Sequence, residues 1–222
     1  MAWAGTTKLI DNFDRAQEFG TTPGQNGWTI ADTSTGGAPT YLCATEDGGA
    51  AVLTLANTNE AEIVTLYHND VLAFDVRKIN QVWWVAKVAG IDAVTTLTIG
   101  VGSARHDTDD TVAVNAWFRM EGSASTSALL YESDDGTTDD NDNSAGTTLA
   151  AVYKKLLIDF TQGLDKVRFF VDGVLVGTTD MSALGAGQNV QPIVQLQKAS
   201  GTGVPAVTIA QFGVSYNWSY GA

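Results

Sequence analysis

Apolar and polar residues alternate along most of this chain, and no long stretch repeats its apolar residues with the 3.6-residue period of an α-helix. Alternation of this kind predicts short β-strands that turn one face toward a core. The stretches that show it recur at regular intervals and are residues 50–56, 63–67, 71–76, 81–89, 94–101, 112–120, 127–131, 153–160, 167–171, 174–178, 190–197 and 206–216. We therefore predict an all-β fold, a two-sheet antiparallel β-sandwich of the jelly-roll kind.

The sharpest local signal is the segment RFFVDGVLVGT, in which Asp172-Gly173 separates two β-rich arms. A two-residue Asp-Gly loop favours the type I′ turn, because its twist matches that of the flanking strands. This segment predicts a tight hairpin. Side chains alternate between the two faces of a strand, so we also predict that Phe170 points away from Val167, Phe169 and Val171.

The 222 residues are enough for one β-sandwich, and we expect a single domain over 1–222. Within it we expect an N-terminal arm at 1–9, the sandwich at 10–218 and a short tail at 219–222. The formal charge of −13 disfavours binding to nucleic acid or to anionic lipid. No 18 consecutive residues are apolar, which predicts no membrane span, and the first residues show no signal-peptide pattern.

The segment 132–148, ESDDGTTDDNDNSAGTT, is almost free of apolar residues and predicts a long loop or hairpin tip. Its carboxylates and amide oxygens are ligands of the type that calcium prefers, with Asp139, Asp140 and Asp142 as candidates. The spacing does not fit an EF-hand, and no glutamate closes the loop. A solvated acidic tip is the favoured interpretation, with no cofactor, and calcium remains the alternative.

A second polar cluster, RHDTDD, carries His106, Asp107, Asp109 and Asp110 between two predicted strands. One histidine beside carboxylates is weak evidence for zinc, which takes further His or Cys ligands. The segment is predicted to be a loop.

Glycoside hydrolysis needs two carboxylates that converge on one face of a sheet. The nearest pattern, Glu132-Ser133-Asp134, opens the polar segment and does not lie within an apolar strand. No nucleophile elbow and no phosphate-binding glycine loop is present in the sequence. These patterns predict a protein without catalytic residues, hence not an enzyme.

The aromatic residues offer a different kind of candidate. Trp83 and Trp84 are adjacent, so in a strand one of them must leave the core side. Trp3 and Trp218 lie near the two ends, where terminal arms often supply contacts in assemblies. Core packing is the commoner use of tryptophan, and stacking on sugar rings is the alternative.

Three stretches together resemble the concanavalin A-like (laminin-G-like) jelly roll: WWVAKVAGIDAVTTLTIGVGSA (83–104), AWFRMEGSASTSALLYESDDG (116–136) and KLLIDFTQGLDKVRFFVDGVLVGTTDMSAL (155–184). A last strand, VTIAQFGVSYNW (207–218), follows them. Within that superfamily the segments are similar to those of tailed-phage virion surface and head-decoration proteins.

This resemblance implies a structural virion protein that binds the outer capsid surface, with the major capsid protein as its partner. It also implies that the protein forms a homo-oligomer, preferably a trimer. It implies assembly in the host cytoplasm and no catalysis. The contact residues expected are Met1, Ala2, Trp3, Trp218 and Tyr220. The alternative is a glycan-binding module of a fibre or spike. A glycoside hydrolase, the third option, would need two facing carboxylates about 5–10 Å apart.

Overall fold

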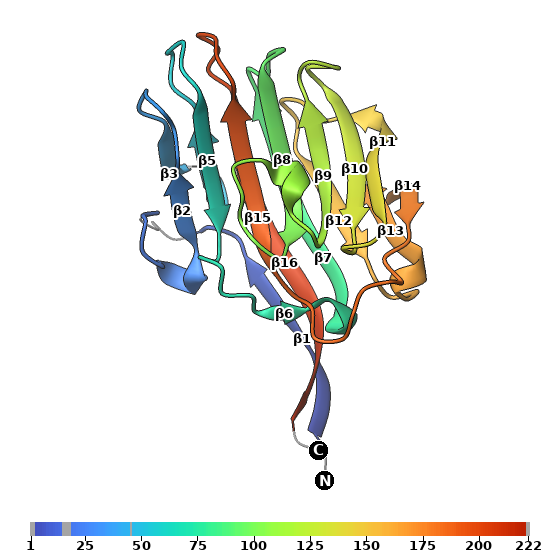
Figure 1. Ribbon diagram of the computed structural model, residues 1–222. Helices are drawn as coiled ribbons and strands as arrows, with labels where there is room; N and C mark the ends of the chain where they lie inside the picture. The colour runs from blue at the N-terminus through green and yellow to red at the C-terminus, as the bar shows by residue number, and fades with distance from the viewer. Residues whose placement is uncertain (1–2, 15–18, 45, 221–222) are drawn as a thin grey trace.

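Two antiparallel sheets pack face to face in the computed structural model, which describes residues 3–14, 19–44 and 46–220 (Figure 1). The back sheet contains β1 (Trp3–Asp11), β3 (Thr40–Ala44), β4 (Ala50–Thr54), β7 (Ile79–Ala89), β12 (Lys154–Asp159), β13 (Val167–Val171), β14 (Val174–Thr179) and β16 (Ala206–Tyr220). The front sheet contains β2 (Thr29–Asp32), β5 (Glu62–Tyr67), β6 (Phe74–Asp75), β8 (Thr95–Gly102), β9 (Asn115–Glu121), β10 (Ala128–Asp134), β11 (Asp139–Thr148) and β15 (Asn189–Lys198). The predicted sandwich is confirmed.

The strand order is β14-β13-β12-β7-β16-β4-β3 in the back sheet, with β1 paired to β16, and β11-β10-β9-β8-β15-β5-β2 in the front sheet, with β6 paired to β15. Short 3₁₀ turns link some strands: η1 (Gln25–Gly27), η2 (Val76–Lys78), η3 (Asp109–Thr111) and η4 (Leu164–Lys166). No helix among the described residues is long and apolar enough to cross a membrane.

Alternation along each strand places the core between the two sheets. Trp84 is fully buried there, whereas Trp83 lies on the outer side of the back sheet, as their adjacency predicted. Phe118 of β9 meets Phe169 of β13 edge to face, with ring centroids 5.4 Å apart, and so joins the front sheet to the back sheet. Aromatic pairs in this geometry stabilise a core beyond the area that they bury.

The β13–β14 hairpin confirms the turn that the Asp-Gly pair predicted. Asp172 and Gly173 have φ angles of 51° and 81°, the positive values that a type I′ turn requires at both central positions. Val171 pairs with Val174 directly across the turn. Phe170 leaves the core and is half-buried on the outer face, which also agrees with its parity.

Two local predictions are wrong. Residues 71–76 do not form a strand of that length, because only Phe74–Asp75 pairs with β15 and the Asp75 side chain then accepts the Arg77 amide to open η2. The acidic segment is not a long loop: residues up to Asp134 belong to β10, Asp139–Thr148 form β11, and only residues 135–138 form the hairpin tip that was the other option. Strand β11 is polar because it is the edge strand of the front sheet, and within it only Ala145 is buried.

Strands β1 and β16 run together as a two-stranded ribbon that leaves the lower end of the sandwich and carries both termini (Figure 1). The register places Trp3 opposite Tyr220 and Gly5 opposite Trp218. Residues 1–9, predicted as an arm, therefore belong in part to a paired strand.

Candidate functional site

The outer face of the front sheet carries a cluster of charged side chains. Along β9 the residues Ala116, Phe118 and Met120 point into the core, so Trp117 and Arg119 point outward. Glu132 of β10 pairs across the strands with Trp117 and accepts a hydrogen bond from its indole nitrogen. This face is therefore polar although most of its side chains are buried.

Burial of this face is explained by the segment between β8 and β9, residues 103–114, which contains η3 and passes in front of the sheet (Figure 1). The hydroxyl of Thr98 in β8 donates a hydrogen bond to the Asp109 carboxylate. Arg105 extends the contact sideways, since its Nε lies 3.3 Å from the hydroxyl of Thr65 in β5. We call residues 103–114 the η3 loop.

Arg119 is the centre of the cluster. Its side chain is 8% exposed, and its guanidinium lies within ion-pair distance of five carboxylates. These are Glu121 at 3.0 Å, Asp110 at 3.2 Å, Glu132 at 3.3 Å, Asp109 at 3.5 Å and Asp142 at 3.5 Å. One cation thus gathers carboxylates from β9, β10, β11 and the η3 loop.

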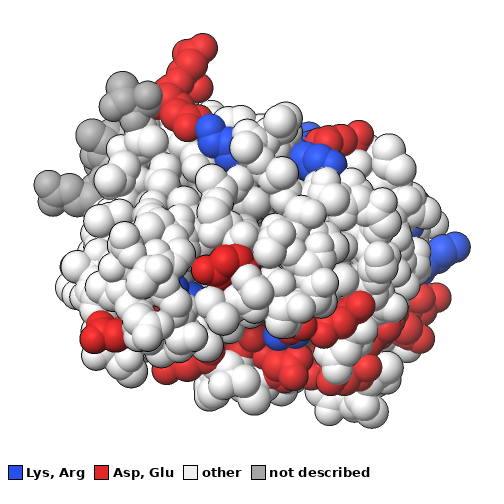
Figure 2. Space-filling model, turned by 90° about the horizontal axis from the view of Figure 1, so that it is seen from above, with Lys and Arg blue, Asp and Glu red and all other residues white. Residues whose placement is uncertain are grey.

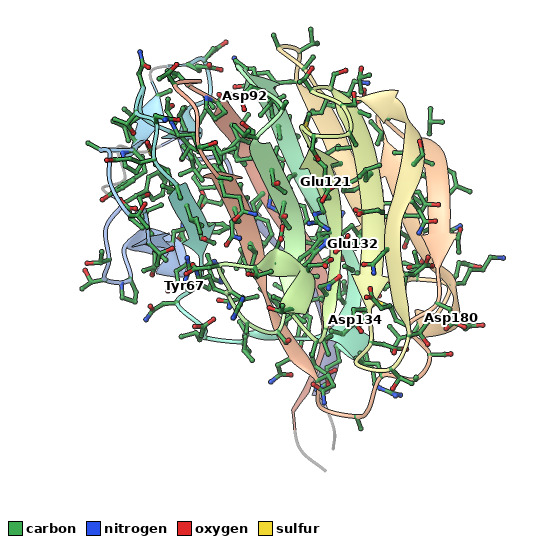
Figure 3. All side chains as sticks on the ribbon, turned by 45° about the horizontal axis from the view of Figure 1, so that its top comes forward. Tyr67, Asp92, Glu121, Glu132, Asp134 and Asp180 are labelled. Carbon is green, nitrogen blue, oxygen red and sulfur yellow. The ribbon has the colours of Figure 1, made fainter. Side chains whose placement is uncertain are left out.

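The titration of Glu132 is shifted by this environment. Burial raises the pKa of the Glu132 carboxyl to about 7, although the Arg119 charge and the Trp117 hydrogen bond act in the opposite direction. Burial also lowers the pKa of Arg119, but the charges of Asp109 and Glu132 outweigh burial and leave that pKa above its ordinary value. Desolvation likewise raises the pKa of Asp134. Figure 3 shows Glu121, Glu132 and Asp134 following one another along this side of the molecule.

An open hollow of about 410 Å³ lies beside the cluster, between the η3 loop and the adjacent rim of the front sheet. Its strand residues Ile63, Gln197 and Thr96 form one cross-strand row over β5, β15 and β8 and are half-buried. Arg119 and Asp110 line the hollow at the loop side. The volume is within the range of about 300–1,000 Å³ that small-molecule sites occupy.

Three buried polar atoms on this side of the sheet have no hydrogen-bond partner among the described residues. They are the Nε of Arg119, the Nε2 of Gln195 and the Oδ1 of Asn115. Buried polar groups in proteins normally have partners, so these atoms mark places where water or a ligand completes the structure.

Acidic side chains also dominate the surface on this side. In the view from above, red atoms form a broad band along the lower edge, which is the side of the front sheet (Figure 2). Two cations of this sheet and its η3 loop are buried: Arg105 is 13% exposed and Lys198 is inaccessible.

The three calcium candidates do not converge in the structure. Asp139 and Asp140 accept hydrogen bonds from Asn141 and Asn143, two residues and three residues further along β11, and Asp142 pairs with Arg119. Within the described part of the chain, no group of three or more His, Cys, Asp or Glu residues is arranged to hold a metal ion. In β11 these carboxylates therefore bond to different neighbours and do not face one common point.

The second polar cluster lies in the η3 loop, as predicted. His106 is exposed, and its Nδ1 bonds within the loop to the Thr108 amide and the Thr111 hydroxyl. Asp107 pairs with Arg105, whereas Asp109 is buried against the sheet. Arg119 was missed by sequence reasoning, although the alternation of Trp117, Arg119 and Glu121 with core residues already indicates a polar outer face.

The expected capsid contacts divide into two groups. Met1 and Ala2 lie outside the described residues. The backbones of Trp3, Trp218 and Tyr220 belong to the β1–β16 ribbon and lie close together at its tip. Whether these residues contact a partner remains a prediction.

No family model and no curated protein matches this chain. Solved structures do match it over nearly the whole length. The carbohydrate recognition domain of Emp47p is 15% identical with a TM-score of 0.60, covering 95% of this chain and 94% of that one. A glycoside hydrolase family 16 protein of Bacteroides ovatus in complex with a glucan product is 9% identical, with a TM-score of 0.62 and coverage of 93% and 99%. The catalytic domain of a Thermotoga petrophila endo-1,3-beta-glucanase is 12% identical, with a TM-score of 0.60 and coverage of 93% and 96%.

The chain has the concanavalin A-like jelly-roll fold. At these identities the likeness concerns the fold alone, and it extends to lectin domains and to glycoside hydrolases alike. The prediction that the protein is not an enzyme is therefore wrong, because solved structures with the same fold include glycoside hydrolases. The main premise of that prediction, the position of Glu132 at the start of a loop, fails as well. Glu132 does not open a loop but lies buried within a strand, where its pKa is raised to about 7.

Proposed function

We propose that this protein binds carbohydrate in the hollow on the front sheet. The observation that carries the proposal is the composition of the hollow, which brings together a hydroxyl (Thr96), an amide (Gln197), a guanidinium (Arg119) and a carboxylate (Asp110). Thr96, Gln197 and Arg119 belong to strands of the front sheet, and Asp110 belongs to the η3 loop that passes in front of it.

Sugar hydroxyls both donate and accept hydrogen bonds, so a sugar site needs both kinds of partner within a short distance. The Asp110 carboxylate accepts, the Arg119 guanidinium donates, and Thr96 and Gln197 do both. Ile63 and the exposed Val94 add apolar surface on the same rim, suited to the C–H face of a sugar ring. None of the described residues that line the hollow is aromatic, which favours hydrogen bonding over ring stacking.

The fold neighbours support this choice and do not decide it. All three carry carbohydrate-related descriptions: a carbohydrate recognition domain, a glycoside hydrolase with a bound glucan product and a glucanase catalytic domain. Brought to this chain, those descriptions favour a saccharide as the ligand of the hollow.

A glycan array, followed by titration calorimetry on the saccharides it selects, tests the proposal. The double variant Thr96→Ala/Gln197→Ala removes two hydrogen-bonding side chains from the hollow and is expected to weaken binding roughly tenfold or more. Gln81→Ala is the matched control, because Gln81 is also a half-buried glutamine in mid-strand but lies in the back sheet. Absence of binding to every saccharide, or equal losses in both variants, rules the proposal out.

The capsid-binding role, with a capsid partner, a trimer and a virion location, stays a prediction carried by the sequence resemblance. The tip of the β1–β16 ribbon would be its contact region. Purified phage particles that lack this protein and equal the complete particles in heat stability would contradict that role.

A further inference from the structure

We infer that residues 104–111 of the η3 loop are a movable cover, and that the carbohydrate site continues beneath them over the front sheet. This inference rests on the proposed function and extends it to a compartment that is closed in the structure. The covered row runs across three strands: Thr65 of β5 pairs with Gln195 of β15, and Gln195 with Thr98 of β8. Arg119 of β9 continues the row.

The cover is held by polar contacts. Of residues 104–111 only Asp109 is buried, and the single apolar residue, Ala104, is exposed. The buried apolar anchors, Val112 and Val114, come after the cover and hold the start of β9. Lifting the cover therefore exposes little apolar surface, and the hydrophobic term does not oppose it.

The polar contacts that hold the cover can be replaced by a hydroxyl-bearing ligand. Asp109 accepts a hydrogen bond from Thr98 and lies 3.5 Å from the Arg119 guanidinium. Arg105 contacts the Thr65 hydroxyl at the other end of the row and Thr33 beside it. A sugar hydroxyl can accept from Arg119 and from Thr98 as Asp109 does now.

The floor under the cover is incompletely bonded in the closed state. Gln195 is 2% exposed, and its Oε1 accepts the Thr65 hydroxyl while its Nε2 has no partner among the described residues. The Nε of Arg119 is in the same condition. An unsatisfied buried donor is costly, so both donors favour any state in which an acceptor reaches them. Two unfilled donors on one row therefore indicate a place for ligand oxygens.

The cover can be locked at one contact that lies away from the floor. The Thr33 hydroxyl, next to the end of β2, donates to the Asp107 carboxylate at 2.7 Å, and both side chains are accessible. The variant Thr33→Cys/Asp107→Cys, made in a Cys43→Ser background because Cys43 is the one native cysteine, places a disulfide there. Loss of free thiols under oxidation reports closure of the disulfide.

Affinity for a saccharide selected by the array is then measured in oxidised and reduced protein. We expect the oxidised, locked form to bind at least roughly tenfold more weakly than the reduced form, because the lock leaves the saccharide only the hollow and withholds the hydrogen-bonding groups of the covered row. The Cys43→Ser protein, with and without reductant, is the control and should show one affinity. Equal affinities of locked and reduced protein overturn the cover while leaving the proposed function intact, and absence of binding in both overturns the two together.

A second measurement does not depend on the disulfide. Amide hydrogen exchange of Thr108, Asp110, Thr111 and Val112, whose backbone N–H groups bond within the closed loop, should become faster when saccharide is bound. Asp109→Ala removes the contacts to Thr98 and Arg119 and should strengthen binding by favouring the open state. Unchanged exchange together with weaker binding of Asp109→Ala contradicts the inference.

Discussion

Glu132 lies directly opposite Trp117 across the β9–β10 pair, and the indole nitrogen of Trp117 donates a hydrogen bond to its carboxyl group. The same carboxyl is 3.3 Å from the Arg119 guanidinium and is 2% exposed. Burial prevails over both partners, so the pKa of Glu132 rises to about 7. A pair of residues on a sheet face thereby links the stability of the fold to pH.

The first prediction concerns Glu132→Gln. The folded protein holds the Glu132 proton with a pKa of about 7, against 4.5 for the ordinary group, so the folded state binds more protons between these values. The free energy of unfolding should fall as pH rises from about 4.5 to about 7, by on the order of 3 kcal/mol, and stay level above. Glu132→Gln lacks this proton, and its stability relative to the natural protein should increase over that window.

Urea denaturation at pH 4.5 and pH 8 measures the difference. Gln81→Ala serves as the control, because it changes no titratable group and its difference from the natural protein should be the same at both pH values. A Glu132→Gln difference that does not change with pH would falsify the link.

A second prediction concerns His68, which acts in the opposite direction. Its ring lies 4.5 Å, centroid to centroid, from the indole of Trp28, and burial lowers its pKa from 6.5 to about 4 while the Asp11 charge opposes the shift. The unfolded chain therefore binds this proton first, and stability should be lost as pH falls from about 6.5 to about 4, by up to about 3 kcal/mol. His68→Gln should lose that dependence.

Proton NMR measures this titration directly, because the chain contains two histidines and the His68→Gln spectrum identifies the signal. A His68 signal that titrates at the ordinary value near 6.5 would contradict the burial argument.

A third prediction concerns the ion pair of Lys198 and Glu62. The Lys198 Nζ lies 3.3 Å from the Glu62 Oε1, and both side chains are inaccessible to solvent. The Lys198 ammonium also donates to the carbonyl groups of Thr58 and Gly203 and so joins two loops at one end of the sandwich. Lys198→Met leaves a buried carboxylate unpaired and should lower the free energy of unfolding by about 3–5 kcal/mol.

The comparison variant is Lys78→Met. Lys78 is also ion-paired, to Asp75 at 3.9 Å, but its side chain is 43% exposed, and such a pair contributes about 0–1 kcal/mol. Similar losses of unfolding free energy in the two variants, measured by urea denaturation, would show that the buried pair stabilises the fold no more than the exposed pair does.

The fourth prediction uses Gly213 in β16, which pairs with Trp83 in β7. A methyl group at Gly213 would lie 2.1 Å from the Trp83 indole, so Gly213→Ala should cost about 1–3 kcal/mol through overpacking. The cost should shrink when Trp83→Leu is combined with it, because the clash is with that ring. Gly20→Ala, which meets nothing within 4 Å, should be nearly neutral in the same denaturation assay. An equal cost with and without Trp83 would place the strain elsewhere.

Local signals predicted much of the fold. The Asp172-Gly173 turn, the opposite faces of Trp83 and Trp84 and the outward position of Phe170 all follow from neighbouring residues alone, and all are confirmed. Strand β11 was not predicted, because it is an edge strand with hardly any apolar residues and so shows no alternation of apolar and polar positions. Its existence depends on backbone pairing with β10, for example Leu130 with Ser144, which composition does not report.

The candidate site was less predictable for the same reason. Arg119 draws its carboxylates from positions 109, 110, 121, 132 and 142, which come together only because β9, β10 and β11 pair and the η3 loop packs over them.

By its own periodicity and turns, the sequence determined a two-sheet sandwich and which side chains leave its core. Only the tertiary structure decided that the η3 loop closes over one sheet face, that Glu132 is removed from water there, and that donors of Arg119 and Gln195 remain unfilled beneath it. The physical reason is range: side-chain alternation acts between neighbours along the chain, whereas burial and charge depend on what other strands and loops place nearby.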